Sequence, residues 1–245
     1  MTDHRVAVVT GAGSGIGRES ALRLARQGIS VIACDRDEHA ARKTVEALRT
    51  EGGEHRWQVF DVADREGVDS AVRDVVADFG RIDILVNAAG HTHFRPFVDL
   101  TEEEWDRTMT VHAKGTFNCV QSVLPHMQAH RYGRIVCIAS VGAMSGSIAH
   151  SHYAAAKAAV IGFAKALCRE IGPYGVTINC VAPGAIDTPL LRSLSSEETY
   201  SKYSETPVGR IGLPEDVAHA VEFLASEGTG FITGWVVSVN GGVYT

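Results

Sequence analysis

Tyr153 and Lys157 stand four residues apart in the run YAAAK, within a stretch of residues that favour helix. Positions i and i+4 share one face of a helix, so this spacing sets an ammonium group beside a phenol. Free tyrosine has a pKa near ~10, and lowering it to about 7 requires roughly 4 kcal/mol of phenolate stabilisation. A neighbouring lysine and a further positive charge could supply much of that energy. The pair is a candidate for acid–base chemistry, although such a pair also arises by chance.

A glycine-rich turn near the N-terminus matches a nucleotide-binding pattern. The β-branched run 5–10 predicts a buried parallel strand, which leads into TGAGSGIG (10–17) and a helical segment over about 18–27. Glycines let the backbone approach a pyrophosphate, and the free amides and dipole of a helix N-terminus attract its charge. Glycine turns also occur for steric reasons, but this one lies between a strand and a helix. The candidate contacts are Gly11, Gly13, Ser14, Gly15, Ile16 and Gly17.

The second predicted strand ends in Asp35, about 20 residues beyond the glycine turn. A carboxylate there can accept hydrogen bonds from the adenosine ribose and would repel a 2′-phosphate, which favours NAD over NADP. Arg36 is contrary evidence, because a guanidinium could accommodate that phosphate. Asp35 could instead cap the next helix, but Asp37 fits the capping position better. We therefore expect NAD as the cofactor.

The chain resembles the compact short-chain dehydrogenases/reductases over essentially all 245 residues. The motifs that carry the resemblance are TGAGSGIG, Asp61-Val62, NAAG (87–90), Ser140, YAAAK (153–157), N-x-x-x-P-G (179–184), Thr188 and TGxxxxVNGG. It implies that 61–62 hold the adenine, that 87–90 form the floor beneath it and that 183–188 cover the nicotinamide. The cofactor contacts that it adds are Asp61, Val62, Asn87, Ala88, Ala89, Gly90, Val111, Tyr153, Lys157, Pro183, Gly184, Ile186 and Thr188.

The resemblance also implies a chemistry for the first pair. Tyr153 as phenolate takes the proton of an alcohol while hydride passes to the nicotinamide, or as phenol protonates a carbonyl in reduction. Lys157 lowers the pKa of Tyr153 and binds the nicotinamide ribose. Ser140, thirteen residues before Tyr153, fixes the substrate oxygen. Serine is also common at the ends of strands, because it favours turns. The spacing of thirteen residues between Ser140 and Tyr153 matches the family, which favours the catalytic role.

His112 occupies a position where the resemblance leads us to expect an asparagine that holds a water in a proton relay. The segment reads MTVHAKGTF. Histidine can donate, accept and titrate near neutral pH, so it could preserve the relay or make it pH-dependent. It could equally be a packed side chain that satisfies a backbone carbonyl. A similar V-H-x-[KR]-G segment recurs in (3R)-hydroxyacyl-CoA dehydrogenases, so we keep His112 among the candidate catalytic residues.

Short predicted strands alternate with helical stretches along the whole chain. This pattern, with 45% hydrophobic residues and 25 glycines, predicts an α/β fold, a doubly wound Rossmann-type three-layer sandwich with a parallel seven-stranded sheet. No linker or charge block marks a boundary, so we expect one dinucleotide-binding and catalytic domain over 1–245. The strands are expected near 5–10, 30–35, 56–61, 82–87, 133–139, 176–181 and 235–239.

Composition limits the possible partners and compartments. The net charge of −6 is spread along the chain, which gives no basic patch for nucleic acid or anionic lipid. No apolar run approaches the ~20 residues of a membrane span, and Met1 to His4 are too short and polar for a signal peptide. The five cysteines lack metal-type spacing and read as free, mostly buried thiols in a reducing cytoplasm. We expect His91, His93, His150 and His152 to line a polar wall or face solvent, without a metal.

The segment 187–207 is a candidate lid over the substrate, because it combines Leu190, Leu191 and Leu194 with serines and glutamates. The expected substrate contacts are Ser140, Tyr153, Leu190 and Leu191. The leucines suggest an alkyl or ring portion in the substrate. Acyl-carrier reductases resembling this chain tend to carry two basic docking residues; Arg131 fits the first position but Tyr174 fills the second. This leaves a 3-hydroxyacyl-CoA or a smaller secondary alcohol open.

Our leading interpretation is an oxidoreductase that moves hydride between NAD(H) and a secondary alcohol or ketone, possibly a 3-hydroxyacyl or 3-oxoacyl thioester. Alternatives are an NADP-dependent ketoreductase for a cyclic or aromatic ketone, a methyltransferase and a non-catalytic module that senses NAD. The last two would not need YAAAK with an upstream serine. The alternating apolar residues at 235–239 predict a strand covered on both faces. The resemblance implies that such C-termini pack across a two-fold axis in a homotetramer.

Overall fold

The computed structural model describes residues 4–51 and 53–245, so the predicted absence of a signal at Met1 to His4 falls largely outside the described residues. Seven parallel strands form one sheet in the order β3-β2-β1-β4-β5-β6-β7. Six of them lie within the segments predicted for them, and β6 extends two residues beyond its predicted segment, 176–181. Their bounds are β1 Val6–Thr10, β2 Ser30–Asp35, β3 Arg56–Val59, β4 Ile84–Asn87, β5 Gly133–Ile138, β6 Val176–Pro183 and β7 Val236–Val239.

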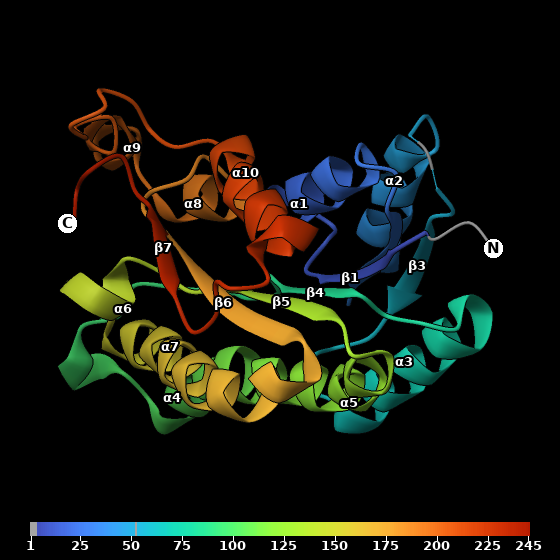
Figure 1. The fold of residues 1–245 in the computed structure, drawn as a ribbon. Coiled ribbons are helices and arrows are strands. Elements are labelled where there is room, and N and C mark those ends of the chain that lie inside the picture. The colour runs from blue at the N-terminus through green and yellow to red at the C-terminus, as the bar shows by residue number, and fades with distance from the viewer. Residues whose placement is uncertain (1–3, 52) are drawn as a thin grey trace.

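Helices cover both faces of the sheet, which confirms the three-layer fold (Figure 1). One layer holds α1 (Gly15–Ala25), α2 (Glu38–Leu48) and α10 (Pro214–Ala225). The other holds α3 (Arg65–Phe79), α4 (Glu102–Met109), α5 (Gly115–His130) and α7 (Ser151–Ile171). Shorter elements are η1 (Phe97–Asp99), η2 (Thr110–Lys114), α6 (Gly142–Ser145), η3 (Gly172–Tyr174), α8 (Pro189–Leu194), α9 (Glu197–Lys202) and η4 (Glu227–Thr229).

The strand order fixes where a ligand can bind. Successive strands run outward from β1 to β3 on one side and from β4 to β7 on the other, so the connections diverge between β1 and β4. In open parallel sheets this divergence leaves a crevice at the carboxyl ends of the strands. The two apolar cores lie on opposite faces of the sheet, one under α3, α5 and α7 and the other under α1 and α10.

The first helix begins earlier than its sequence suggests. We expected it from about residue 18, whereas α1 starts at Gly15 behind Ser14, whose backbone is extended at φ −155°. Gly15 and Gly17 therefore lie inside the first helical turn, whereas Gly11 and Gly13 precede it. A Cβ atom at Gly17 would lie only 2.2 Å from the carbonyl oxygen of Gly11, so glycine is required there by the fold itself.

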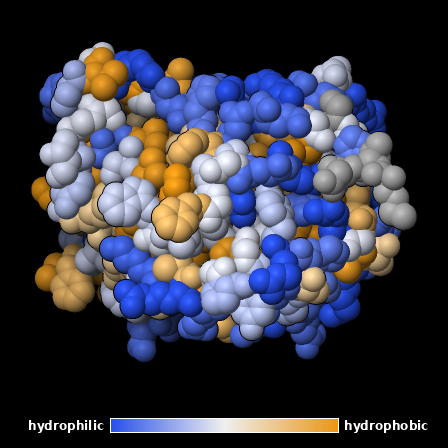
Figure 2. Space-filling view, in the orientation of Figure 1, coloured by the Kyte–Doolittle hydropathy of each residue, from blue (hydrophilic) through white to orange (hydrophobic). Residues whose placement is uncertain are grey.

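The last strand is not covered on both faces, which corrects our expectation for residues 235–239. β7 is an edge strand, its residues are partly exposed, and Trp235 beside it is 65% exposed. Apolar side chains gather over β7 in the space-filling view (Figure 2). The alternation of apolar residues resembles that of a buried strand, but in the single chain no further layer reaches this edge.

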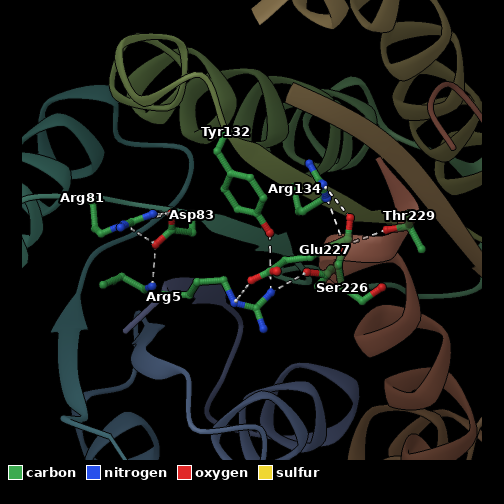
Figure 3. A network of polar contacts seen from close by, with 10 residues as sticks. Arg5, Arg81, Asp83, Tyr132, Arg134, Ser226, Glu227 and Thr229 are labelled. Atoms are coloured by element: carbon green, nitrogen blue, oxygen red, sulfur yellow. Dashed lines mark hydrogen bonds and ion pairs between the residues drawn. The ribbon is translucent and has the colours of Figure 1, made fainter. Parts of the chain in front are cut away.

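A polar network joins the amino ends of the strands (Figure 3). Asp83 accepts hydrogen bonds from the backbone of Val6 at 2.8 Å and from Arg81, and Arg5 pairs with Glu227 at 3.6 Å. The guanidinium of Arg134, stacked over the ring of Tyr132, donates to the carbonyls of Ser226 and Glu227. The network therefore ties the segment after α10 to strands β1, β4 and β5 at the end of the sheet opposite the crevice.

Within the described part of the chain, no helix combines the length and the hydrophobicity that a membrane crossing requires. All five cysteines are free thiols, and four of them, Cys34, Cys119, Cys137 and Cys180, are buried. The expectation of free, mostly buried thiols is therefore confirmed.

Candidate active site

Helix α7 carries Tyr153 and Lys157 on one face, as the spacing predicts. The ammonium of Lys157 is buried and donates a hydrogen bond of 2.6 Å to the carbonyl oxygen of Ile138, the last residue of β5. The same nitrogen lies 5.7 Å from the centre of the Tyr153 ring. The lysine therefore fixes α7 against the carboxyl end of the sheet and brings the tyrosine to the crevice.

Ser140 lies beside this pair, two residues after the end of β5. Its hydroxyl oxygen accepts the backbone N–H of Gly142 at 3.1 Å, which orients the side chain at the start of α6. A hydrogen bond with Ser140 lowers the pKa of Tyr153, so the two hydroxyls lie within reach of each other. The structure thus brings together the three residues predicted from the YAAAK motif and the upstream serine.

In the protein alone, the electrostatics of the pair oppose our expectation of an acidic tyrosine. Burial raises the pKa of Tyr153 to about 12, and the hydrogen bond with Ser140 offsets this only in part. Burial lowers the pKa of Lys157 to about 8. Both shifts have the same cause, because an enclosed site disfavours charged forms. Lys157 is not the source of a lowered tyrosine pKa in this environment.

The glycine turn faces the same crevice from β1. Thr10 accepts hydrogen bonds from the amides of Ala88 and Ala89 at 3.1 and 3.2 Å, which join this turn to the NAAG segment after β4. The side chain of Ser14 makes no capping hydrogen bond, and the first intrahelical bond of α1 comes from Arg18. The amides of the first turn therefore remain available for a pyrophosphate, so these residues fit a dinucleotide.

The carboxylate of Asp35 is held in place by two backbone N–H groups. One oxygen accepts the N–H of Gly13 at 2.9 Å and the other accepts the N–H of Asp37 at 3.0 Å. Asp37 caps α2 through the amide of Ala40, as predicted. The Asp35 carboxylate therefore stays at the rim of the turn and leaves its remaining lone pairs to a ligand.

A cavity of about 80 Å³ opens beside Asp35. Among the predicted cofactor contacts, those that line it are Gly11, Asp35, Arg36, Asp61, Val62, Ala89, Gly90 and Val111. Four further lining residues were not predicted as cofactor contacts: Thr10, Cys34, Phe60 and His91. Asn87 is buried behind it and lies 3.6 Å from the sulfur of Cys137. The residues suit the adenosine half of a dinucleotide, with apolar walls for the base and a carboxylate for the ribose.

A second cavity, of about 180 Å³, joins the glycine turn to the catalytic residues. Ser140 and Tyr153 line it, together with the predicted contacts Ile16, Pro183, Gly184, Ile186, Thr188, Leu190 and Leu191. Leu194 completes the apolar wall supplied by α8, and Thr92, Phe94 and His150 also line the cavity. The sequence did not indicate that Thr92 and Phe94 would line this cavity, because no motif includes the residues after NAAG.

His112 lies in η2, a π-helical turn between α4 and α5. Such turns are frequent at functional sites. Its Nε2 atom lies 2.7 Å from the carbonyl oxygen of His91, whereas Nδ1 is buried without a hydrogen-bond partner. The edge of its ring meets the ring of Tyr153 at 5.2 Å. Burial and the nearby charge of Lys157 hold the pKa of His112 well below its usual value, so the ring is neutral.

Of the other histidines, His150 and His91 line the two cavities, and His150 also contacts Tyr153. The ring of His150 stacks on that of Tyr153 at 4.6 Å and 14°, and the rings of His93 and His152 lie 4.5 Å apart. Among the described residues, no group of three or more histidine, cysteine, aspartate or glutamate side chains could hold a metal ion. The pKa of each of His91 and His150 is lowered to about 4, mainly through burial.

Known proteins resemble this chain along nearly its whole length. Residues 11–244 match the family model described as "Enoyl-(Acyl carrier protein) reductase". The (2S)-[(R)-hydroxy(phenyl)methyl]succinyl-CoA dehydrogenase subunit BbsD of Thauera aromatica is 42% identical, over 98% of this chain and 96% of its own. The short-chain reductase protein NovJ of Streptomyces niveus is 43% identical, over 99% and 95%. The 3-oxoacyl-[acyl-carrier-protein] reductase FabG of Thermotoga maritima is 38% identical, over 98% of each chain.

These matches agree with the arrangement of a glycine turn, a carboxylate at the rim of that turn and a serine–tyrosine–lysine group around one crevice. The chain belongs to the short-chain dehydrogenase/reductase family and is an NAD(P)-dependent oxidoreductase that interconverts secondary alcohols and ketones.

Proposed function

We propose that this enzyme uses NAD(H) and acts on a 3-hydroxyacyl or 3-oxoacyl thioester or a ketone of similar shape. The observation that carries the proposal is the cavity in which Ser140 and Tyr153 meet the residues around the glycine turn. Its other walls are mostly apolar, which suits an acyl or aryl portion. Two relatives are named for hydroxyacyl-CoA or 3-oxoacyl substrates, which supports the same class.

In this proposal Tyr153 is the acid or base, Ser140 orients the substrate oxygen, and Lys157 holds both in register. The bound nicotinamide would supply or accept the hydride and, when oxidised, a positive charge that favours the phenolate. The residues proposed to hold the cofactor are those that line the two cavities, with the amides at the start of α1 facing the pyrophosphate. A raised pKa of Tyr153 suits the reductive direction, because the phenol then carries the proton that a ketone needs.

We propose that residues 187–207 act as a lid within a single domain over 1–245. Leu190, Leu191 and Leu194 turn toward the cavity from α8, while Arg192 pairs with Asp187 at 2.5 Å and stiffens the start of this segment. All seven strands belong to one sheet, which supports a single catalytic unit. Limited proteolysis tests the lid: NADH with a bound ketone should slow cleavage within 187–207, and an unchanged cleavage rate would contradict it.

We also propose a homotetramer in the cytoplasm. Phe223, Phe231 and Trp235 are 52%, 103% and 65% exposed around the edge strand, and an apolar groove between α5 and α7 is lined by Phe117, Leu124 and Phe163 among others. Apolar faces of this kind are usually covered by a partner.

Light scattering should give the mass of four chains of 26.2 kDa, and the mass of one chain would contradict the assembly. The five free thiols fit a reducing compartment.

The central prediction concerns the acid–base residue. Tyr153→Phe keeps the ring but removes the proton, so we expect turnover of a panel of 3-oxoacyl-CoA thioesters and cyclic ketones to fall at least about 100-fold. NADH affinity, followed by cofactor fluorescence, should stay unchanged. Tyr132→Phe, in the network at the other end of the sheet, is the matched control. Loss of both turnover and NADH binding would mean that Tyr153 is structural.

The cofactor preference is predicted to depend on the charge of Asp35. Asp35→Asn keeps an oxygen acceptor for the Gly13 amide but removes the charge that would repel a 2′-phosphate. The ratio of kcat/KM for NADH to that for NADPH should fall at least about tenfold, with Arg36 available to the phosphate. Asp37→Asn, which removes a charge two residues away at the helix cap, should leave the ratio nearly unchanged. A wild-type preference for NADPH would overturn the assignment.

His112 is predicted to contribute to proton transfer through its unpartnered Nδ1 atom. His112→Ala should slow turnover at least about tenfold while NADH affinity is kept, and His112→Asn, which retains polar atoms, should recover part of the loss. Because its pKa is lowered, His112 is neutral above pH about 6.5 and should add no step to the pH profile there. Turnover of His112→Ala equal to wild type at every pH would remove this residue from the mechanism.

A further inference from the structure

A hydrogen-bonded pair in the lining of the substrate cavity has no part in the chemistry derived above. The hydroxyl of Thr92, on the segment after β4, contacts Nε2 of His150, which precedes α7. Both residues line the cavity of about 180 Å³ that also contains Ser140 and Tyr153. The pair therefore adds a second polar point to a pocket whose remaining walls are mostly apolar.

The ring of His150 packs against two other aromatic rings. Phe94 packs on it at 4.6 Å between ring centres and 36° between planes, and Tyr153 stacks on it at 4.6 Å and 14°. A side chain that is held in this way keeps its orientation without help from a ligand. The ring centres of His150 and Tyr153 are 4.6 Å apart. Polar atoms of these two side chains can therefore contact two groups of one substrate that are only a few atoms apart.

The pair always leaves one proton free to donate. If the hydroxyl of Thr92 donates to Nε2 of His150, the ring proton lies on Nδ1 and is not used within the pair. If Nε2 instead donates to Thr92, the hydroxyl proton of Thr92 is not used within the pair. In both tautomers one donor therefore remains on two residues that line the pocket, and a ligand acceptor can use it.

The pair is also uncharged at neutral pH. The pKa of His150 is lowered to about 4, first by burial and then by the neighbouring rings of His152 and His93. His93 lies 3.5 Å from Glu104 on α4, and the nearest groups on the other side are Phe94 and Tyr153. A single neutral donor among apolar walls suits a carbonyl oxygen better than a carboxylate, which needs several donors or a positive charge.

We propose that Thr92 and His150 determine substrate specificity by donating one hydrogen bond to a second carbonyl oxygen of the substrate, next to the ketone held by Ser140 and Tyr153. The enzyme would thereby select 1,3-dicarbonyl compounds such as 3-oxoacyl esters and thioesters over simple ketones. This inference rests on the proposed ketone reduction and adds to it the feature of the substrate that is recognised and the residues that recognise it.

Two matched ketones test the inference. Ethyl 3-oxobutanoate and 4-ethoxybutan-2-one share one skeleton, and only the first carries the second carbonyl. For each protein the ratio of kcat/KM for the ester to that for the ether is measured with NADH. The double variant Thr92→Val/His150→Phe, which removes both donors, should lower this ratio about tenfold relative to wild type, since about 1.4 kcal/mol corresponds to tenfold. His150→Phe keeps an aromatic ring between Phe94 and Tyr153.

Thr92→Ser, which retains the hydroxyl, is the control and should keep the ratio within about threefold of wild type. The single variants Thr92→Val and His150→Phe each leave one donor that its partner no longer orients, so each should lower the ratio less than the double variant does. If the variants slow both ketones in equal proportion, the pair only positions Tyr153 and the inference is overturned while the proposed function stands. If the wild type reduces neither ketone nor any of the thioester panel, both fail.

Discussion

The active site depends on a buried ammonium group bonded to the end of a central strand. Lys157 donates to the carbonyl oxygen of Ile138 at 2.6 Å, and both residues are buried. An ammonium enclosed without an acceptor would be costly, so this bond fixes the register of α7 against β5. Ser140 follows Ile138 by two residues and Tyr153 precedes Lys157 by one helical turn. One electrostatic requirement therefore sets the relative positions of all three groups.

Enclosure has a second consequence for the same residues. It raises the pKa of Tyr153 to about 12 and lowers that of Lys157 to about 8, and it keeps the surrounding histidines neutral. Each shift favours the uncharged form. The protein by itself holds a protonated phenol, ready to serve a ketone. Formation of a phenolate for alcohol oxidation therefore depends on positive charge that is brought into the site, and not on Lys157 alone.

The sequence predicts well what local patterns encode. All seven strands lie where β-branched runs and turns indicated, and Asp37 caps α2 as expected. Prediction is poorer where the outcome depends on distant segments. Thr92 and His150 are 58 residues apart, and nothing in either local sequence signals their contact. The exposure of β7 was not predicted, because the sequence of an apolar strand does not show whether the residues that pack on it belong to the same chain or to a partner.

The two ends of the sheet show how a functional site differs from a structural one of similar polarity. At the amino ends, Arg5, Asp83 and Arg134 find their partners within the chain and close a network of carbonyls and charges. At the carboxyl ends, the first amides of α1 and the Nδ1 atom of His112 have no such partner. Buried or fixed polar groups left unpaired cost stability unless a ligand completes them. These unpaired groups lie at the end of the sheet where strand order opens a crevice, so topology and hydrogen bonding point to the same place as the motifs.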